Sequence, residues 1–354
     1  MLRHYGVQTD YAGLPVVDKA LASNPKNVVV WILDGLGLDL FHKILPPKAF
    51  LKYHIKDEIS SVFPPTTTAA TTTYYCGLPP AVHGWIGWAP YFPEYQRSIQ
   101  LFTGLDDYTH EPTGVNPFQK LPYGHIFDRI RAAAPAVSCH EVFPNKIRAN
   151  GVDTFEEQCQ HILKYSQCGG SHFILAYWPE PDHTCHINGT YDDSVKKLVR
   201  HMNHEIHKLC RKLKDTLLII SADHGHVPVS DIFYIDTCPD ITDCLRVPLN
   251  LDDRVNAIFL KDGKEDDFLK AYDTYLNSDF MLLKSDEALS KNLFGFGPLN
   301  PRIKDFIGDY LLIATGTRVL RQRVGDFVSG PAFKSSHAGL TKREMIVPLF
   351  LINK

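Results

Sequence analysis

The chain has 354 residues, of which 44% are hydrophobic and 22% are charged, and this composition is typical of a globular protein with a large core. The formal net charge of -3 and the pI of about 6.6 exclude a broad basic surface that would hold a nucleic-acid polymer. Any affinity for phosphate must therefore come from a local site.

The sequence also argues against export and against insertion into a membrane. Residues 1–25 contain no long apolar run after a basic start, and no other stretch reaches the roughly 18 uninterrupted apolar residues of a spanning helix. The eight cysteines are scattered, which is the pattern of free thiols in a reducing compartment. We therefore expect a cytoplasmic protein that binds neither membranes nor nucleic-acid polymers.

Three short apolar runs predict buried strands, and a carboxylate follows each of them. Continuous apolar runs are typical of strands that are buried on both faces of a parallel sheet. Because ligands bind at the carboxyl ends of the strands in open α/β sheets, we expect the three carboxylates to lie at the ligand-binding edge. The runs and their carboxylates are 27–33 with Asp34, 173–178 with Asp182, and 216–222 with Asp223.

The segment between the second and third strands predicts an amphipathic helix. Apolar residues recur at three- and four-residue steps from Val195 to Leu213, which gives one apolar face that can cover the sheet. This β-α-β order predicts a doubly wound, mostly parallel sheet with helices on both faces. The last apolar run, 345–352, contains Pro348, so we expect it at an edge or at a bulge.

Two long segments predict the domain organisation. Residues 89–150 are rich in Pro, Tyr and Phe with weak periodicity, and they predict a long excursion over the core. Residues 228–335 contain their own strand, helix and strand, and they predict a small inserted α/β subdomain or cap. The remaining residues, 1–227 and 336–354, would form the catalytic core. The strand, helix and strand of the insertion are expected at 255–260, 266–276 and 309–314.

Six side chains supply the oxygen and nitrogen donors that zinc prefers in proteins. They are Asp34, Asp182, His186, Asp223, His224 and His337. The Asp-x-x-x-His spacing and the adjacent Asp-His pair let neighbouring donors converge on one ion. Each motif alone has a structural alternative, because Asp-Gly after a strand is also a common turn and a single histidine is a weak signal. The six donors together are enough for two open sites with three ligands each.

A run of three threonines provides a candidate nucleophile. The segment reads VFPPTTTAAT from Val62 to Thr71, and it is followed by Gly77 and by His83-Gly84. In isolation such a run is better explained as a strand or as a helix cap. A hydroxyl becomes a good nucleophile near neutral pH only when a base or a metal ion lowers its pKa, and the predicted metal site supplies that activation.

Taken in order, these motifs resemble the alkaline phosphatase superfamily, and within it the type I phosphodiesterases and nucleotide pyrophosphatases. The motifs are a strand ending in Asp-Gly, FPPTTTAA, GLPP-x-x-HG, EPD-x-x-x-H, SADHG and a late His-x-Gly, and they extend across nearly all of the chain. The resemblance implies an alkaline-phosphatase-like fold and a division of the ligands between two ions. That division is Asp182, His186 and His337 for one ion and Asp34, Asp223 and His224 for the other.

The resemblance also implies a mechanism. It places Thr67 in the nucleophile position of the family, ten residues before Gly77, with Thr66 and Thr68 as neighbouring alternatives. It implies two divalent ions, with zinc favoured by the His-rich ligands and manganese as the alternative. Thr67 would attack phosphorus in line and form a phospho-threonine that water hydrolyses, with net retention at phosphorus. The expected substrate is a small phosphate ester or a nucleotide-like diester.

One position departs from the family pattern. The nucleotide pyrophosphatases have an Asn a few residues beyond the His-Gly that helps to hold a phosphoryl oxygen, and here Trp88 falls near that position. Strict nucleotide pyrophosphatase activity is therefore not implied. Trp88 could stack a base or a sugar, but aromatic residues at such a turn are more often packing residues. His183 and His226 flank predicted ligands and could contact substrate or orient a ligand, and Lys334 could neutralise a substrate phosphate.

Two other functions stay open at this point. A phosphomonoesterase or a phosphonate hydrolase would use the same metal site and would differ in pocket groups that motif spacing does not reveal. A non-catalytic binding protein that retains the metals is the alternative from a different class. Structural zinc sites are typically closed by four protein ligands, so two open sites beside a threonine are more typical of an enzyme.

Overall fold

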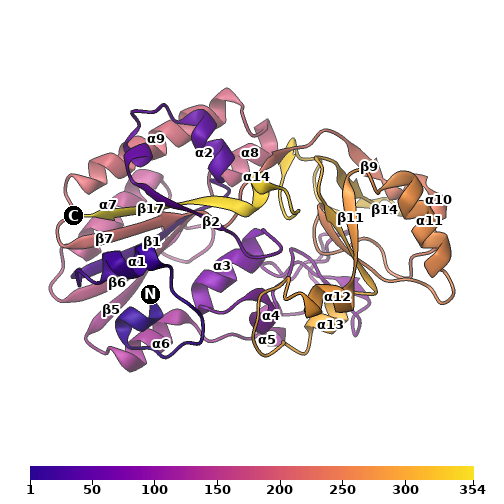
Figure 1. The fold of residues 1–354 in the computed structure, drawn as a ribbon, viewed down its shortest axis with the longest axis horizontal. Helices are drawn as coiled ribbons and strands as arrows, with labels where there is room; N and C mark the ends of the chain where they lie inside the picture. The colour runs from indigo at the N-terminus through magenta and orange to yellow at the C-terminus, as the bar shows by residue number, and fades with distance from the viewer. The chain divides into compact units, whose positions relative to one another are not determined.

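The computed structural model describes all 354 residues, and they divide into two compact units. The first unit contains Met1–Ser60, Gly124–His226 and Ile346–Lys354, and the second contains Ser61–Tyr123 and Val227–Met345. Figure 1 labels the helices and strands of both units. The predicted insertion at 228–335 lies in the second unit together with residues 61–123, and the predicted division into a catalytic core and an insertion stays a prediction.

The first unit is built on a six-stranded sheet in the order β2-β17-β7-β1-β6-β5. Neighbouring strands are parallel from β7 to β5, and β17 and β2 complete the sheet with antiparallel pairs. The three strands predicted from apolar runs are therefore confirmed as neighbours, with β1 in the middle. The strands are β1 (Asn27–Leu33), β2 (Ile55–Ser60), β5 (Val137–Val142), β6 (Ser171–Trp178), β7 (Thr216–Ser221) and β17 (Ile346–Asn353).

Helices cover both faces of this sheet, which confirms the predicted α/β fold class. On one face, α2 (Leu38–Ile44), α7 (Phe155–Ser166) and α9 (Asp193–Cys210) share a single apolar core with the strands. On the other face lie α1 (Pro15–Leu21) and α6 (Ile126–Ala133) (Figure 1). All seven residues of β1 are buried. Each large apolar side chain buried in this way contributes roughly 1.5 to 3 kcal/mol, which is why a short apolar run is a sufficient signal for a central strand.

The last strand, β17, was predicted at an edge or at a bulge, and the structure agrees with the second alternative. It lies between β2 and β7 rather than at an edge, although a register shift does fall between Leu349 and Phe350. Only Phe350–Asn353 pairs with β7, so the missing N–H of Pro348 falls outside that ladder. The carbonyl oxygen of Pro348 instead accepts a hydrogen bond from the Ser221 hydroxyl at 2.9 Å. A proline is therefore compatible with an interior strand at this position.

Residues 89–150 contribute elements to both units. Strands β3 (Tyr91–Phe92) and β4 (Arg97–Ser98) and helix α5 (Pro117–Lys120) belong to the second unit, whereas α6 and β5 belong to the first. In the edge strand β5 only Val142 is buried, so its apolar periodicity is weak. This half-exposed edge position is the physical reason why the sequence pattern did not reveal the strand.

The second unit contains a three-stranded antiparallel sheet in the order β10-β12-β11. The strands are β10 (Val255–Ile258), β11 (Phe280–Lys284) and β12 (Tyr310–Ala314), and α11 (Glu265–Tyr275) packs against them. The predicted strand, helix and strand of this region are confirmed. The shorter helices of this unit are α3 (Thr67–Cys76), α4 (Pro80–His83), α10 (Pro239–Thr242), α12 (Ser285–Ser290), α13 (Ile303–Phe306) and α14 (Lys342–Met345). Its short strands form three pairs, which are β8 (Val227–Pro228) with β16 (Ser335–Ser336), β9 (Ile232–Tyr234) with β13 (Val319–Arg321), and β14 (Arg323–Val324) with β15 (Phe327–Val328).

None of the helices in either unit combines the length and the apolar character that crossing a membrane requires.

Asp107 is a buried carboxyl of the second unit, and burial raises its pKa to about 7. This value exceeds the pKa of the same carboxyl in the unfolded state. The contribution of Asp107 to the unfolding free energy is therefore fully present only below about pH 4, and it is lost as the pH rises through 7. Asp107→Asn removes the charge and keeps an acceptor for the Gln100 side chain, which donates to Oδ1 of Asp107 at 3.2 Å. We expect the variant to exceed the wild type in unfolding free energy by up to about 4 kcal/mol at pH 8 and to match it near pH 4. Urea unfolding at both pH values measures this, and an equal difference at the two values would contradict it.

Candidate metal centre and nucleophile segment

Three segments at the carboxyl ends of β6, β1 and β7 bring the predicted metal donors of the first unit together. Asp34 follows β1, Asp223 follows β7, and α8 (Asp182–Asn188) follows β6. Two backbone hydrogen bonds hold the segment after β1 next to the segment after β6. Asp34 N donates to Trp178 O at 2.9 Å, and Asp182 N donates to Asp34 O at 3.0 Å. The parallel register of the strands thus places side chains that are far apart in sequence at one edge, as predicted.

Asp34, Asp223 and His224 form the first group of donors, and all three are buried. Nε2 of His224 lies 3.2 Å from Oδ1 of Asp34 and 3.8 Å from Oδ2 of Asp223. Two ligands of a tetrahedral zinc ion lie about 3.3 Å apart, so these spacings fit one ion. Nδ1 of His224 lies 3.1 Å from the carbonyl oxygen of Gly225, which can only accept a hydrogen bond. Nδ1 therefore carries a hydrogen, and Nε2 faces the carboxylates as the atom that could bind a metal.

The electrostatics of this group also fit a divalent cation. Burial raises the pKa of the Asp34 carboxyl well above its usual value, and the nearby Asp182 carboxylate raises it further. Burial likewise raises the pKa of Asp223, with the charge of Asp34 as the second cause. Oδ1 of Asp34 is buried and receives no hydrogen bond. A bound cation would favour the ionised form of both carboxyls and would coordinate that oxygen.

Asp182, His186 and His226 form the second group of donors. Oδ1 of Asp182 lies 3.2 Å from Nε2 of His186, which is the spacing of two ligands of one ion. The same oxygen lies only 2.7 Å from Nε2 of His226, which is the length of a hydrogen bond. Burial lowers the pKa of His226 to about 4, so the neutral ring donates its Nε2–H to the carboxylate. Burial acts to raise the pKa of Asp182, but the two histidines outweigh it and hold that pKa well below its usual value.

Gly35 makes this close arrangement possible. Its φ is +70°, and a Cβ atom at this position would lie 2.8 Å from Nε2 of His226 and 2.9 Å from Cα of Asp182. No side chain fits there, so only glycine lets the turn after β1 approach α8 so closely. The N–H of Gly35 also donates to Oδ1 of Asp223 at 3.1 Å. The glycine of the Asp-Gly pair that follows β1 therefore allows the close backbone packing on which both donor groups depend.

Tyr177 belongs to this site although the sequence did not single it out. Its hydroxyl, near the end of the apolar strand β6, donates a hydrogen bond to Oδ2 of Asp34. Tyr177→Phe removes this bond and keeps the ring, so we expect the affinity for one zinc ion to fall about 10- to 100-fold. The unfolding free energy of the metal-free protein should change by only about 1 kcal/mol. Zinc titration against a competing chelator measures the affinity, and an unchanged value would remove Tyr177 from the site.

The threonine run lies in the second unit, where Thr66 immediately precedes α3. The Thr66 hydroxyl donates to Oδ2 of Asp252 at 2.9 Å, and the Thr68 hydroxyl donates to the carbonyl oxygen of Gly87 at 2.7 Å. Both of these threonines are buried, whereas Thr67, the first residue of α3, is half-buried. Thr67 is therefore the most accessible of the three.

Two histidines of the second unit contact this segment. Nδ1 of His337 lies 3.2 Å from the carbonyl oxygen of Pro65, so Nδ1 carries the hydrogen and Nε2 is the atom that could bind a metal. His83 is buried, accepts a hydrogen bond from the N–H of Trp85 at 3.0 Å, and places Nε2 3.1 Å from the Thr73 hydroxyl. Burial lowers the pKa of His83 to about 3. His83, the histidine of the His-Gly motif, is therefore neutral, and its ring connects the backbone at Trp85 to α3.

The residues predicted to contact substrate occupy different environments. Trp88 is half-buried, His183 is exposed on α8, and Lys334 is exposed before β16. His226 is buried against a metal donor, as described above. Trp85 is fully buried and its Nε1–H donates to a backbone carbonyl at 2.9 Å, so this tryptophan is a packing residue.

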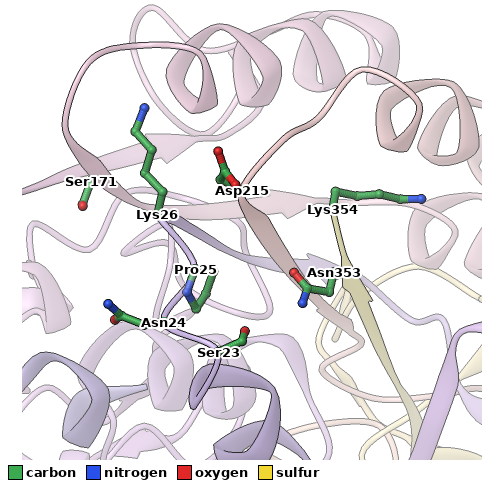
Figure 2. Close-up of a pocket in the computed structure, with 8 residues that line it drawn as sticks. All are labelled: Ser23, Asn24, Pro25, Lys26, Ser171, Asp215, Asn353 and Lys354. Carbon is green, nitrogen blue, oxygen red and sulfur yellow. The ribbon is translucent and has the colours of Figure 1, made fainter.

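A pocket lies at the opposite edge of the sheet of the first unit. Figure 2 shows its residues at the amino ends of β1, β6 and β7 and at the end of β17. The lining residues are Ser23, Asn24, Pro25, Lys26, Ser171, Asp215, Asn353 and Lys354. None of the predicted site residues lines this pocket, so it is separate from the donor groups.

A family model for type I phosphodiesterase/nucleotide pyrophosphatase matches residues 28–295. No curated protein sequence matches the chain.

Solved structures with low sequence identity share the fold. Murine ectonucleotide pyrophosphatase/phosphodiesterase 5, as an inactive variant in complex with AMP, has a TM-score of 0.66 and 19% identity over 91% of this chain and 87% of that chain. The human protein of the same name has a TM-score of 0.67 and 17% identity over 92% and 87%. Phosphonoacetate hydrolase from Sinorhizobium meliloti 1021, in complex with phosphonoformate, has a TM-score of 0.64 and 17% identity over 92% and 90%. These similarities confirm the predicted alkaline-phosphatase-like fold.

Proposed function

Because the chain belongs to the type I phosphodiesterase/nucleotide pyrophosphatase family, we propose that it is a two-metal phosphoryl-transfer hydrolase that acts on a small phosphate ester through a phospho-threonine intermediate. Members of this family are metal-dependent enzymes that act on phosphoester bonds. The observation that carries the proposal is the convergence of two groups of metal donors, at ligand spacing, at the carboxyl ends of three parallel strands.

The ligands divide between the two ions as follows. One ion would be held by Asp34, Asp223 and His224, and the other would be held by Asp182 and His186, with His337 added by the family resemblance. The 2.7 Å contact supports His226 as a partner that orients Asp182 rather than as a further ligand. The His-rich donor set favours zinc, with manganese as the alternative.

The chemistry follows from the residues of the chain. When bound, the two divalent ions would neutralise phosphoryl oxygens and lower the pKa of a nearby hydroxyl. Thr67 attacks phosphorus in line, the ester oxygen leaves, and a phospho-threonine forms. Water then attacks the phospho-threonine in line, which releases a phosphate monoester from a diester substrate, or phosphate from a monoester substrate, and returns a proton to the Thr67 hydroxyl. Thr67 is half-buried whereas Thr66 and Thr68 are buried, and this greater exposure supports Thr67 as the nucleophile of the run.

We propose a small substrate that is nucleotide-like. Two similar solved proteins hold AMP and phosphonoformate, and both ligands are small. Trp88, near the position where the family has an Asn, would stack a base or a sugar rather than hold a phosphoryl oxygen. His183 and Lys334, which are exposed, would contact the outer part of the substrate.

We also propose a cytoplasmic location. All eight cysteines are free thiols, which supports a reducing compartment.

The test compares bis-p-nitrophenyl phosphate, p-nitrophenyl phosphate and phosphonoacetate with zinc- or manganese-loaded protein, and uses Thr67→Ala as the control. Faster turnover of the diester that depends on Thr67 is the expected result. Preference for the monoester would identify a phosphatase, and phosphate release from phosphonoacetate would identify a phosphonate hydrolase. Metal binding without turnover of any ester would contradict the proposal and favour a binding protein.

A further inference from the structure

Arg254 and Glu344 form a fully buried ion pair in the second unit. Nε of Arg254 lies 2.5 Å from Oε1 of Glu344, and Nη2 lies 2.9 Å from Oε2, so the pair is bidentate. The guanidinium also donates to the carbonyl oxygens of Arg318 at 2.8 Å and Gly316 at 2.7 Å. Arg254 is therefore fixed in one orientation by four partner atoms.

Glu344 connects this pair to the turn that follows His337. Oε1 accepts a hydrogen bond from the N–H of Gly339 at 2.7 Å, and Oε2 accepts from the N–H of Thr341 at 3.2 Å and from its hydroxyl at 2.6 Å. A Cβ atom at Gly339 would lie 3.0 Å from both Oε1 of Glu344 and Nη2 of Arg254. The ion pair thus packs directly against the backbone of this turn.

The backbone of this turn, residues 338–341, is strained at its first residue. Ala338 is buried and has a φ of +90°, which is unfavourable for any residue except glycine. Such a conformation persists only where the flanking atoms hold it, and strained residues of this kind occur preferentially at functional sites. On one side His337 donates from Nδ1 to the carbonyl oxygen of Pro65, and on the other side Gly339 donates to Glu344.

A buried ion pair is not by itself a strong source of stability, because burying two charges costs about as much as their attraction returns. The bidentate pair, the three hydrogen bonds to the turn and the strained Ala338 indicate a geometric role instead. We infer that Arg254 and Glu344 are positioning residues that hold the 338–341 turn so that the His337 imidazole keeps one orientation. This inference rests on the proposed function, in which His337 is a metal ligand.

The alternative is that the pair stabilises the second unit without affecting His337, and a matched variant separates the two. Arg321 is also buried, with 1% of its surface exposed, and it pairs with Asp253 at 2.5 Å but does not contact the 338–341 turn. Arg254→Lys and Arg321→Lys therefore make the same change at two buried ion pairs. Only the first should disturb the orientation of His337.

The experiment measures zinc affinity by competition with a chelator, and unfolding of the metal-free protein, for the wild type and both variants. We expect Arg254→Lys to weaken one of two zinc equivalents about 10- to 100-fold and Arg321→Lys to leave both within about threefold. A second pair of variants, at Thr341, changes the turn without removing a buried charge and so avoids loss of folding. Thr341→Val should lower the affinity for the same zinc equivalent by at least about threefold, and Thr341→Ser should restore that affinity. Equal effects of Arg254→Lys and Arg321→Lys on zinc affinity, or wild-type affinity in Arg254→Lys and Thr341→Val, would overturn the inference.

A His337→Ala variant distinguishes failure of this inference from failure of the proposed function. If the wild type binds two zinc equivalents and His337→Ala binds one, the proposed ligand role stands, and the Arg254 and Thr341 variants test the positioning role alone. If His337→Ala keeps both equivalents at wild-type affinity, the proposed ligand set is wrong, and the positioning inference is overturned with it.

Discussion

Replacement of Thr67 by alanine should leave two zinc equivalents bound and lower kcat by at least about 10⁴-fold, because the hydroxyl that forms the covalent intermediate is lost while the donor groups are unchanged. Thr67→Ser keeps a hydroxyl and should retain measurable turnover. Steady-state kinetics on the preferred ester, with metal content measured on the same samples, tests both statements.

Thr68→Val is the neighbouring control for this prediction. It removes the hydrogen bond to the Gly87 carbonyl and should cost about 1 to 3 kcal/mol of unfolding free energy, because a buried acceptor loses its donor. The kcat of this variant should stay within a few fold of the wild type. A fully active Thr67→Ala, or an inactive Thr68→Val that still folds and binds zinc, would move the nucleophile to another threonine of the run.

Asp223→Asn should reduce bound zinc from two equivalents to one and lower kcat by at least about 10³-fold, because Asp223 is buried with Asp34 and His224 in a single donor group. The same change should stabilise the metal-free protein by about 1 to 3 kcal/mol, since it removes one of two buried carboxylates that repel each other. The zinc-saturated variant should be less stable than the zinc-saturated wild type, since each site filled to about 1,000 times its Kd adds about 4 kcal/mol.

Asp107→Asn is the matched control for Asp223→Asn, because it also removes a buried carboxyl. Both variants should stabilise the metal-free protein at pH 8, but only Asp223→Asn should lose a zinc equivalent. Thermal unfolding with chelator and with excess zinc, together with metal analysis, measures these effects. Full zinc content in Asp223→Asn would remove Asp223 from the ligand set.

The strands and the carboxylates that follow them could be predicted because the signal is local. A strand buried on both faces is apolar along most of its length, and the first polar residues after β1 and β7, Asp34 and Asp223, lie at the edge formed by the carboxyl ends of the strands. The same reasoning fails for β5, in which only Val142 is buried. For β17 the same reasoning left an edge and a bulge open, and the strand lies inside the sheet with a register shift near Pro348, because only the missing N–H of proline has to be kept out of a ladder.

The partners that orient the predicted site residues could not be predicted, because each contact joins residues that are distant in sequence. Tyr177 contacts Asp34, and Asp252 contacts Thr66, only after the sheets and turns have formed. For His226 the sequence left contact with substrate and orientation of a metal ligand equally possible. A distance of 2.7 Å to the Asp182 carboxylate distinguishes a hydrogen bond from shared coordination, and spacing along the chain holds no such information.

The position of β17 has a consequence for the order in which the chain folds during synthesis. The edge strand β2 pairs only with β17, and β7 relies on β17 for one of its two sides, yet β17 is the last of the six strands of the sheet to be made. A nascent chain that already contains all six predicted metal ligands therefore still lacks a completed sheet, and it exposes the open side of β7 and the unpaired β2. Exposed strands of this kind pair readily with other chains. The nascent chain should therefore depend most on chaperones in the period between the synthesis of β7 and the synthesis of β17.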